Sequence, residues 1–230
     1  MTSDPERTAG TAASIGVLDP SDAAQAGELL ATSHGEYPAF RHLFPHPVRR
    51  RRALRPFMTA TARDAALFGR CFVARDDQGL LGVALWMPPG TFPLSAMRKA
   101  RMTPALLRVA LAAPRSFPPF ARVGAGLEKA HPPGPLWYLQ ALGVQPRAQR
   151  RGLGGQLVTP ALAMADESGA ACHLHTSDPS NIAYYQRFGF EVTQRALRVL
   201  PGGPAYLGMS REPRRSPPSP GPKRRSRSAR

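Results

Sequence analysis

The sequence has few cysteines and no long hydrophobic run. Its two cysteines, Cys71 and Cys172, are too few for a disulfide framework, and their spacing does not fit a zinc site. We expect both to be buried free thiols. No apolar run approaches the ~18–20 residues of a membrane span, and the first residues lack the apolar stretch of a secretory signal. These absences favour a soluble, cytoplasmic protein.

Lysine and acidic residues are also scarce. Arginine supplies most of the 31 basic residues, against 15 acidic ones, and the formal net charge is +16. Residues 213–230 alone carry seven basic residues and no acid. The tail could contact the phosphates of a nucleic acid. Alternatively, it is a solvated segment whose arginines reflect the codon usage of a GC-rich genome.

The length of 230 residues suits one domain with extended ends. Residues 1–13 are small and polar, and residues 213–230 mix Pro, Ser and Arg without apolar anchors, so both are predicted to be disordered. The domain is expected at 14–212. Within it, residues 88–135 are rich in proline and are interpreted as an insertion between two strands.

Hydrophobic periodicity predicts an alternation of strands and helices, hence an α/β (α+β) fold. Strands are expected at 15–18, 70–75, 80–87, 136–144, 171–176, 190–200 and 205–211. Helices are expected at about 21–33, 48–68, 95–112, 118–129, 152–168 and 179–189. Ser21 or Asp22 is the expected N-cap of the first helix and Asp178 that of the last, with a possible break of the third helix near Pro104. The aromatic stretch 35–47 is predicted to be a loop.

The segment 142–155, LGVQPRAQRRGLGG, is the most informative in the chain. A strand leads into a turn, and the following helix begins among arginines and glycines. Glycine lets successive N–H groups converge, and a helix N-terminus carries about half a positive charge, so this segment is suited to a pyrophosphate. The nucleotide P-loop pattern GxxxxGK[ST] is absent, and the dinucleotide pattern GxGxxG is not matched.

Two signatures carry a resemblance to a known family. Gln149-x-x-Gly152-x-Gly154 matches the Q/R-x-x-G-x-G/A signature of GCN5-related (GNAT) N-acetyltransferases. The segment 181–190, NIAYYQRFGF, resembles that family's N-xxx-(F/Y)-Y-xxx-GF segment and follows at the usual distance. Within the superfamily, 136–211 is most similar to the puromycin N-acetyltransferase-like group.

The resemblance implies a fold, an activity and a cofactor site. The fold would be a central mixed, mostly antiparallel sheet flanked by helices, with the helical insertion between the third and fourth strands. The activity would be direct transfer of an acetyl group from acetyl-CoA to the primary amine of a small molecule. The implied cofactor-binding residues are Leu142, Gly143, Val144, Gln149, Arg150, Arg151, Gly152, Leu153, Gly154, Gly155 and Asn181.

The resemblance also suggests catalytic groups. Tyr185 stands four residues before Gly189, where the family places its general acid; the alternative is that Tyr184 and Tyr185 are packing aromatics. His175 is the candidate base, at a position where relatives often have Glu, and alternation puts it on the same strand face as His173. The alternative is an ordinary strand histidine. The His-x-His pair lacks a third ligand, so no metal site is predicted.

The acceptor site is expected between the aromatic stretch and the insertion. Its candidate residues are Tyr37, Phe40, His42, Phe44 and His46, which could equally be core packing. No dense acidic patch is present to bind a polycation, which favours a partly apolar amine. A rival hypothesis is an acyl-CoA-binding protein that associates with nucleic acid or the ribosome through its basic tail. The sequence is compatible with a monomer or a homodimer.

Overall fold

A computed structural model describes residues 13–214; nearly all of the two terminal segments predicted to be disordered, 1–13 and 213–230, therefore lies outside the described residues. The strands are β1 (Ser14–Val17), β2 (Phe72–Asp76), β3 (Gly79–Met87), β4 (Leu136–Val144), β5 (Ala171–Thr176), β6 (Glu191–Leu197) and β7 (Tyr206–Arg211). The helices are α1 (Ala23–Ser33), α2 (Pro38–Leu43), α3 (Pro47–Phe68), α4 (Ala96–Ala112), α5 (Phe117–Ala130), α6 (Leu153–Glu167) and α7 (Asn181–Gln186), with 3-10 turns η1 (Pro20–Asp22) and η2 (Pro146–Ala148).

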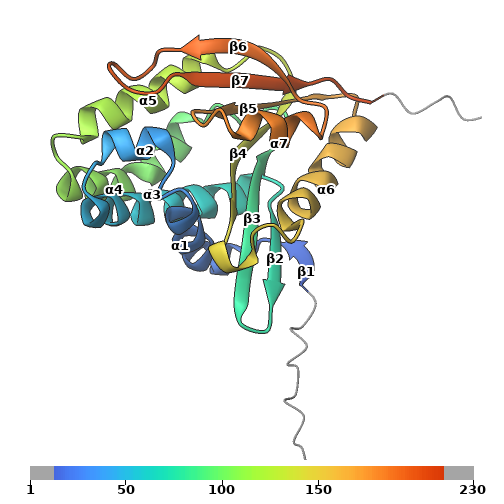
Figure 1. Ribbon diagram of the computed structural model, residues 1–230, viewed down its shortest axis with the longest axis horizontal. Helices are drawn as coiled ribbons and strands as arrows, with labels where there is room; N and C mark the ends of the chain where they lie inside the picture. Colours follow the sequence, from blue (N-terminus) through green and yellow to red (C-terminus); the bar gives the residue numbers. More distant parts are fainter. Residues whose placement is uncertain (1–12, 215–230) are drawn as a thin grey trace, which may run out of the picture.

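One seven-stranded sheet organises the molecule, in the order β1-β2-β3-β4-β5-β7-β6 (Figure 1). Only β4 and β5 pair in parallel, and the other neighbours are antiparallel. The predicted mixed, mostly antiparallel sheet flanked by helices is confirmed, and the helical insertion does lie between the third and fourth strands.

The parallel pair β4–β5 separates before either strand ends. Pairing runs from Leu136 opposite Ala171 only as far as Leu139 opposite Leu174. Strand β4 continues to Val144 and β5 to Thr176. Beyond Leu139 no strand within residues 13–214 pairs with the edge of β4 that faces β5, so the sheet opens here.

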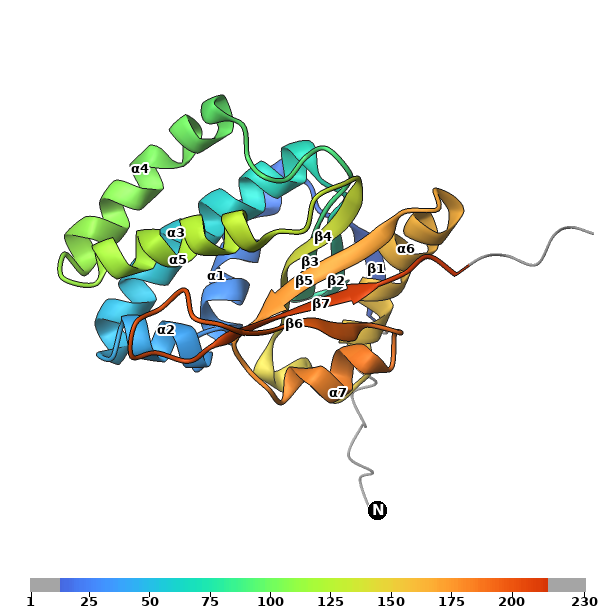
Figure 2. The same cartoon turned by 90° about the horizontal axis from the view of Figure 1, so that it is seen from above.

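Helices cover both faces of the sheet, and each face has its own hydrophobic core (Figure 2). One core joins α1, α3 and the insertion to the sheet, and the other joins α6 and α7 to the opposite face. Strand β3 is buried on both faces from Leu80 to Met87, which explains its unbroken hydrophobic run.

The insertion enters and leaves the sheet at one place, because Met87 at the end of β3 pairs with Tyr138 on β4. A buried ion pair ties it to the body: Arg98 Nε on α4 donates to Asp64 Oδ1 on α3 at 3.0 Å. The possible break near Pro104 does not occur, and α4 is continuous. Its buried side chains, Met102 and Val109 among them, hold both halves against the core despite the lost hydrogen bond.

Two local predictions were wrong, and a third was met only in part. The stretch expected to be a loop contains α2, because Pro38 occupies its first turn, where a missing N–H costs nothing. Asp22 does stand at the N-cap of α1, but its side chain makes no capping hydrogen bond; the capping carboxylate is that of Asp19, which accepts from Ser21 N at 2.7 Å at the start of η1. Asp178 binds Ser180 N at 3.0 Å in a turn that precedes α7 and does not cap the helix.

Both cysteines are buried and free, as expected. Among residues 13–214, no helix is long and apolar enough to cross a membrane. The same part of the chain contains no cluster of three or more His, Cys, Asp or Glu side chains able to hold a metal ion.

Candidate active site

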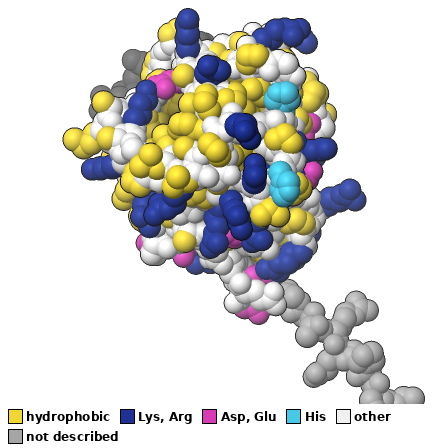
Figure 3. Space-filling model, turned by 90° about the vertical axis from the view of Figure 1, so that its left-hand side faces the viewer, with side chains coloured by type: hydrophobic (Ala, Val, Ile, Leu, Met, Phe, Trp, Pro, Cys, Tyr) yellow, Lys and Arg dark blue, Asp and Glu magenta, His cyan; other side chains and the backbone are white. Residues whose placement is uncertain are grey.

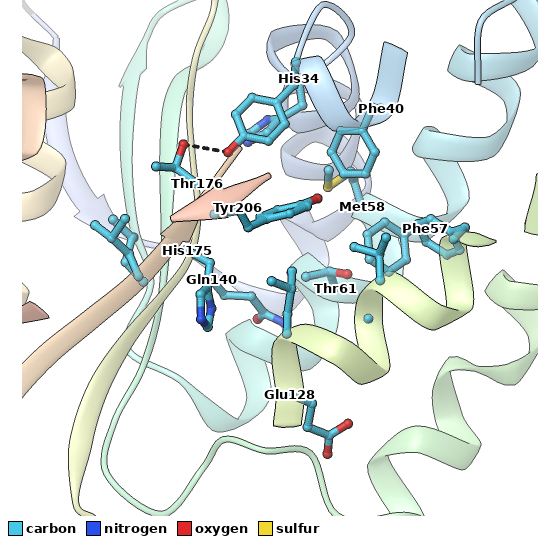
Figure 4. A pocket seen from close by; sticks show the side chains of 18 of the residues that line it. His34, Phe40, Phe57, Met58, Thr61, Glu128, Gln140, His175, Thr176 and Tyr206 are labelled. Carbon is cyan, nitrogen blue, oxygen red and sulfur yellow. Dashed lines mark hydrogen bonds between the residues drawn. The ribbon is translucent and has the colours of Figure 1, made fainter. Parts of the chain in front are cut away.

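A cavity of about 780 Å³ lies where the sheet opens. Its walls come from the α1–α2 segment, α3 and the insertion, and from residues of β4, β5, α7 and β7 (Figure 4). Most of its lining is apolar or aromatic: Tyr37, Phe40, Phe57, Met58, Phe92, Met102, Leu106, Phe117, Phe120, Tyr138, Leu142 and Tyr206. The cavity can therefore enclose a molecule with a substantial apolar part.

The aromatic stretch contributes two of the five residues expected from it. Tyr37 and Phe40 line the cavity. Phe44 is buried against Phe120 in the core, His42 is exposed, and His46 borders a separate small cavity. Helix α2 explains why Phe40 and His42 differ, because a helical period of 3.6 residues turns their side chains in different directions.

Tyr37 fixes this segment to the end of β5. Its hydroxyl lies 2.7 Å from Thr176 Oγ1, the bond drawn dashed in Figure 4, and accepts from Ser177 N at 2.6 Å. Burial raises the pKa of Tyr37 above its ordinary value. The hydroxyl is thus a neutral anchor, and both of its bonds hold the wall of the cavity in place.

The two histidines of β5 share one face, as predicted. His175 lines the cavity, its Nδ1 lies 3.3 Å from Tyr138 Oη, and its Nε2 lies 3.2 Å from His173 Nε2. His173 is fully buried and does not reach the cavity. Burial is the main cause that lowers the pKa of His175 to about 4 and that of His173 to about 3, with a smaller contribution from His131. Both imidazoles are neutral at pH 7, so each has a nitrogen lone pair.

Tyr185 also borders the cavity from α7, with only 8% of its surface exposed. Burial raises the pKa of its phenol well above the ordinary value near 10, so it carries its proton at neutral pH. Asn181, one turn earlier, reaches the same cavity and donates from Nδ2 to Thr176 Oγ1 at 3.2 Å. A proton acceptor and a proton donor thus lie on different walls of one cavity.

The glycine- and arginine-rich loop lies between η2 and α6. Arg150 and Gly152 have positive φ values of 61° and 78°, which turn the chain sharply into the helix. The first helical bond runs from Gln156 N to Gly152 O, so the N–H groups of Leu153, Gly154 and Gly155 have no partner within α6. Arg150 and Arg151 are exposed beside them.

The start of α6 is closely covered by α7. A Cβ at Gly154 would lie 2.5 Å from Tyr184 Oη, whereas one at Gly155 would make an ordinary contact with Phe188. The Tyr184 hydroxyl is buried without a hydrogen-bond partner among the described residues. Free N–H groups, two guanidinium groups and the glycine at the close approach fit a pyrophosphate. This loop does not line the cavity.

The unpaired edge of β4 completes the geometry. Gln145 N donates to Leu81 O at 2.8 Å, and antiparallel pairs alternate, so the peptide groups of Gly143 face β3. Those of Leu142 and Val144 therefore face the opening. Val144 O accepts from Gln149 Nε2 at 3.1 Å, while the N–H groups of Leu142 and Val144 point into the gap. Leu142, Gly143 and Val144 were expected at the cofactor. The backbone N–H of Gly143 faces β3, so of these three residues only Gly143 has no N–H directed at the opening.

Residues 32–190 match the sequence model described as the acetyltransferase (GNAT) family. This chain belongs to the GNAT acetyltransferase family. The matched region contains the opening of the sheet, the α6 loop and α7, so the GNAT enzyme carries the family's sequence pattern at the site just described.

Solved structures agree with the fold of this GNAT enzyme. One is described as a histone acetyltransferase HPA2 and related acetyltransferase from Corynebacterium glutamicum, with TM-score 0.64 and 22% identity over 90% of this chain and 99% of that chain. PaiA N-acetyltransferase from Thermoplasma acidophilum, in complex with coenzyme A, has TM-score 0.55 and 12% identity over 87% and 99%. Drosophila melanogaster polyamine N-acetyltransferase has TM-score 0.55 and 18% identity over 87% and 100%. At these identities the similarity is one of fold.

Several lining residues of the GNAT enzyme escaped the sequence analysis. Tyr138 and Gln140 line the cavity together, and strand alternation could have predicted that they share one face of β4. Tyr206 begins β7 and reaches the cavity from across the sheet, which only the strand order reveals.

Proposed function

We propose that this GNAT enzyme transfers the acetyl group of acetyl-CoA to the primary amine of a small molecule that has a large apolar or aromatic part. The observation that carries the proposal is the aromatic cavity of about 780 Å³ at the point where β4 and β5 separate. His175 and Tyr185 border this cavity, so both proton-transfer groups lie within reach of a bound amine.

The donor would bind along the opening of the sheet and the α6 loop. The free N–H groups of Leu153 to Gly155, with Arg150 and Arg151, would hold the pyrophosphate. The unpaired edge at Leu142 and Val144 would bind the pantetheine arm through backbone hydrogen bonds. Asn181 would add a contact on the α7 side. Acetyl-CoA supplies the activated acetyl group, and the protein holds the two reactants together.

His175 would accept the proton of the attacking amine. It is neutral at pH 7, because burial lowers its pKa to about 4, and it lines the cavity. Tyr185 would give a proton to the departing thiolate, because burial keeps its phenol protonated. Both side chains have the protonation state that their role needs before the substrates bind: His175 is unprotonated and Tyr185 is protonated.

The charges around the cavity favour an aromatic amine over a polycation. Glu36 accepts from Arg50 at 2.6 Å, and Glu128 is paired with Lys99, so two of the lining carboxylates are neutralised by the protein itself. The third, Asp178, binds Ser180 in its turn. Figure 3 shows one face of the molecule, where apolar side chains are surrounded by basic ones with few acids. Among the described residues that line the cavity, a ligand with several positive charges thus has one carboxylate, that of Asp178, which is not paired with a basic side chain.

Thermal denaturation with acetyl-CoA, combined with free-thiol release over a set of amines, tests the proposal. Puromycin is the first amine because of the sequence resemblance, and arylalkylamines, agmatine and spermidine complete the set. We expect a rise in Tm with acetyl-CoA and thiol release with aromatic amines at much lower concentration than with spermidine. No Tm change at millimolar acetyl-CoA would overturn the donor assignment, and a preference for spermidine would overturn the acceptor class.

A further inference from the structure

A row of polar side chains crosses four neighbouring strands on one face of the sheet. Tyr138 on β4 lies 3.3 Å from His175 on β5, which lies 3.2 Å from His173 on the same strand. His173 Nδ1 is 2.9 Å from Ser210 Oγ on β7, and Ser210 Oγ is 3.0 Å from Thr193 Oγ1 on β6. Each step is within hydrogen-bonding distance, so the row is continuous.

The two ends of the row meet different surroundings. Tyr138 and His175 border the acceptor cavity, and His173 in the middle is fully buried. Thr193 is exposed on β6, the edge strand of the sheet. The sheet register produces this alignment, because His173 is directly opposite Tyr138 on one side and Ser210 on the other. The row therefore connects the inside of the cavity to solvent on another side of the molecule.

One assignment of hydrogens satisfies the whole row with every group neutral. Tyr138 donates to His175 Nδ1, His175 Nε2–H to His173 Nε2, and His173 Nδ1–H to Ser210. Ser210 then donates to Thr193, whose hydroxyl donates to Gly208 O at 3.4 Å. From Tyr138 to Ser210 every donor points from the cavity toward the edge strand, which is the order needed to pass a proton outward, and the row ends at the solvent-exposed Thr193.

We infer that this row conducts the proton of the acceptor amine from His175 to solvent at the edge strand β6. This inference rests on the proposed function. The amine N–H bond breaks and the proton enters at His175 Nδ1, directly or through the Tyr138 hydroxyl. His175 passes its Nε2 proton to His173, which passes its Nδ1 proton to Ser210. Ser210 passes one to Thr193, and Thr193 releases one to water. One proton enters and one leaves, and no charge remains in the row.

The surroundings of the histidines require such an outlet. Burial lowers the pKa of His175 to about 4, so an imidazolium formed there does not persist at neutral pH. The other groups that face the pair are His131, whose ring centre is 5.7 Å from that of His173, Tyr138 and Gln194. Within residues 13–214 no carboxylate faces either ring to stabilise the charge. A base in this position works only if it passes the proton on.

Substitutions at the solvent end test the row without touching either binding site. Thr193→Val removes the hydroxyl at nearly constant volume, and Thr193→Ser is the matched control that keeps it. Ser210→Ala and Ser210→Thr form a second pair. We expect kcat at pH 7 to fall about tenfold in Thr193→Val and Ser210→Ala, with a larger solvent deuterium isotope effect. KM for both substrates and Tm should stay close to wild type, and Thr193→Ser should retain activity.

A merely structural role for the row predicts a change in Tm without a change in the isotope effect. If the wild-type enzyme is active, and Thr193→Val and Ser210→Ala both keep its kcat and its isotope effect, the relay is overturned. The proposed function would then remain intact. Nitrogen-15 NMR gives a readout independent of activity. Opposite tautomers on His173 and His175 keep the row connected, while the same tautomer on both would break it and overturn the inference.

Discussion

At the scale of single residues, burial decides which side chains of this site carry protons. Tyr185 and His175 face the same cavity, and loss of hydration keeps both neutral: it raises the pKa of the phenol and lowers that of the imidazole. Neutral groups of this kind can give and take protons during the reaction without an ion pair having to be broken.

Tyr185→Phe removes the proposed donor and leaves the packing of the ring in place. We expect kcat to fall about 10²–10⁴-fold, because general acid catalysis contributes on that order. The Kd for acetyl-CoA, measured by calorimetry, should change little. A kcat within twofold of wild type would assign Tyr185 to packing, the alternative that the sequence left open.

Tyr184→Phe is the matched control on the neighbouring residue. Its hydroxyl is buried without a partner in the described part of the chain, and an unsatisfied buried hydroxyl costs about 1–3 kcal/mol. The variant should therefore be as stable as wild type or more stable in urea denaturation, with kcat retained. Loss of activity here as large as in Tyr185→Phe would indicate a packing effect in both.

Acidification should destabilise the protein through its buried histidines. The unfolded chain binds protons near pH 6.5, whereas the folded pKa is about 4 for His175 and about 3 for His173. Between these values the unfolded state holds more protons, so stability is fully present above about pH 6.5 and falls as the pH drops toward 4. Each histidine contributes up to about 1.4 kcal/mol per pH unit. Burial shifts His34 in the same direction.

Urea denaturation from pH 7.5 to 5 measures this effect. His173→Gln should reduce the slope of stability against pH, since one of the shifted groups is then missing. A slope unchanged by the substitution would mean that folding does not lower the pKa of His173. That result would also contradict the neutral hydrogen-bond row across the sheet.

At the scale of elements, the contact between α6 and α7 leaves different amounts of space for a side chain at the adjacent Gly154 and Gly155. Gly154→Ala places a methyl group 2.5 Å from Tyr184 Oη, and the rigid ring cannot move without shifting α7. We expect a loss of about 1–3 kcal/mol in stability and weaker acetyl-CoA binding. Gly155→Ala meets only an ordinary contact with Phe188 and should be neutral or stabilising, because alanine favours a helix.

Denaturation and acetyl-CoA titration of the two variants provide the comparison. The double variant Gly154→Ala with Tyr184→Phe should recover part of the loss, because it removes the atom that the methyl group meets. Equal effects of the two alanines would show that α7 does not pack on the start of α6 in solution.

The elements themselves were largely predictable, because hydrophobic periodicity fixes their type. The strands 136–144 and 171–176 have the predicted bounds, and the insertion helices differ by one or two residues. The failures are local: α2 was hidden by a proline that suits a helix start, and α4 survives Pro104 because tertiary burial outweighs one lost hydrogen bond. The N-cap expected at Asp178 was misplaced, because an aspartate side chain can also bind a backbone N–H group within a turn.

The site was less predictable than the fold, because its parts meet only across the sheet. The family resemblance suggested Tyr185 and His175 as catalytic groups, and both residues line one cavity. Their pKa values, the polar row through Ser210 and the part played by Tyr206 depend on strand order and register. Those arise from long-range pairing that no local pattern encodes.

At the scale of the whole molecule, the basic tail and the domain can be tested separately. Asp166 binds Arg211 and the backbone N–H of Arg214, so a truncation should keep Arg214 and remove only residues 215–230. We expect Tm, acetyl-CoA binding and kcat to be retained, because every element of the site lies before that point. Nucleic-acid binding, measured in a salt series, should be lost if the tail provides it. Loss of acetyl-CoA binding on truncation would contradict this division.

The pairing of Met87 with Tyr138 has a consequence for how such enzymes diversify. The segment 88–135 begins and ends at adjacent points of the sheet, so its length and sequence can change while the strands around it keep their register. It supplies one wall of the cavity proposed to bind the acceptor and none of the groups proposed to hold acetyl-CoA. A single exchange of genetic material within this segment would give a descendant enzyme a new amine to modify while its reaction with the donor stays as inherited.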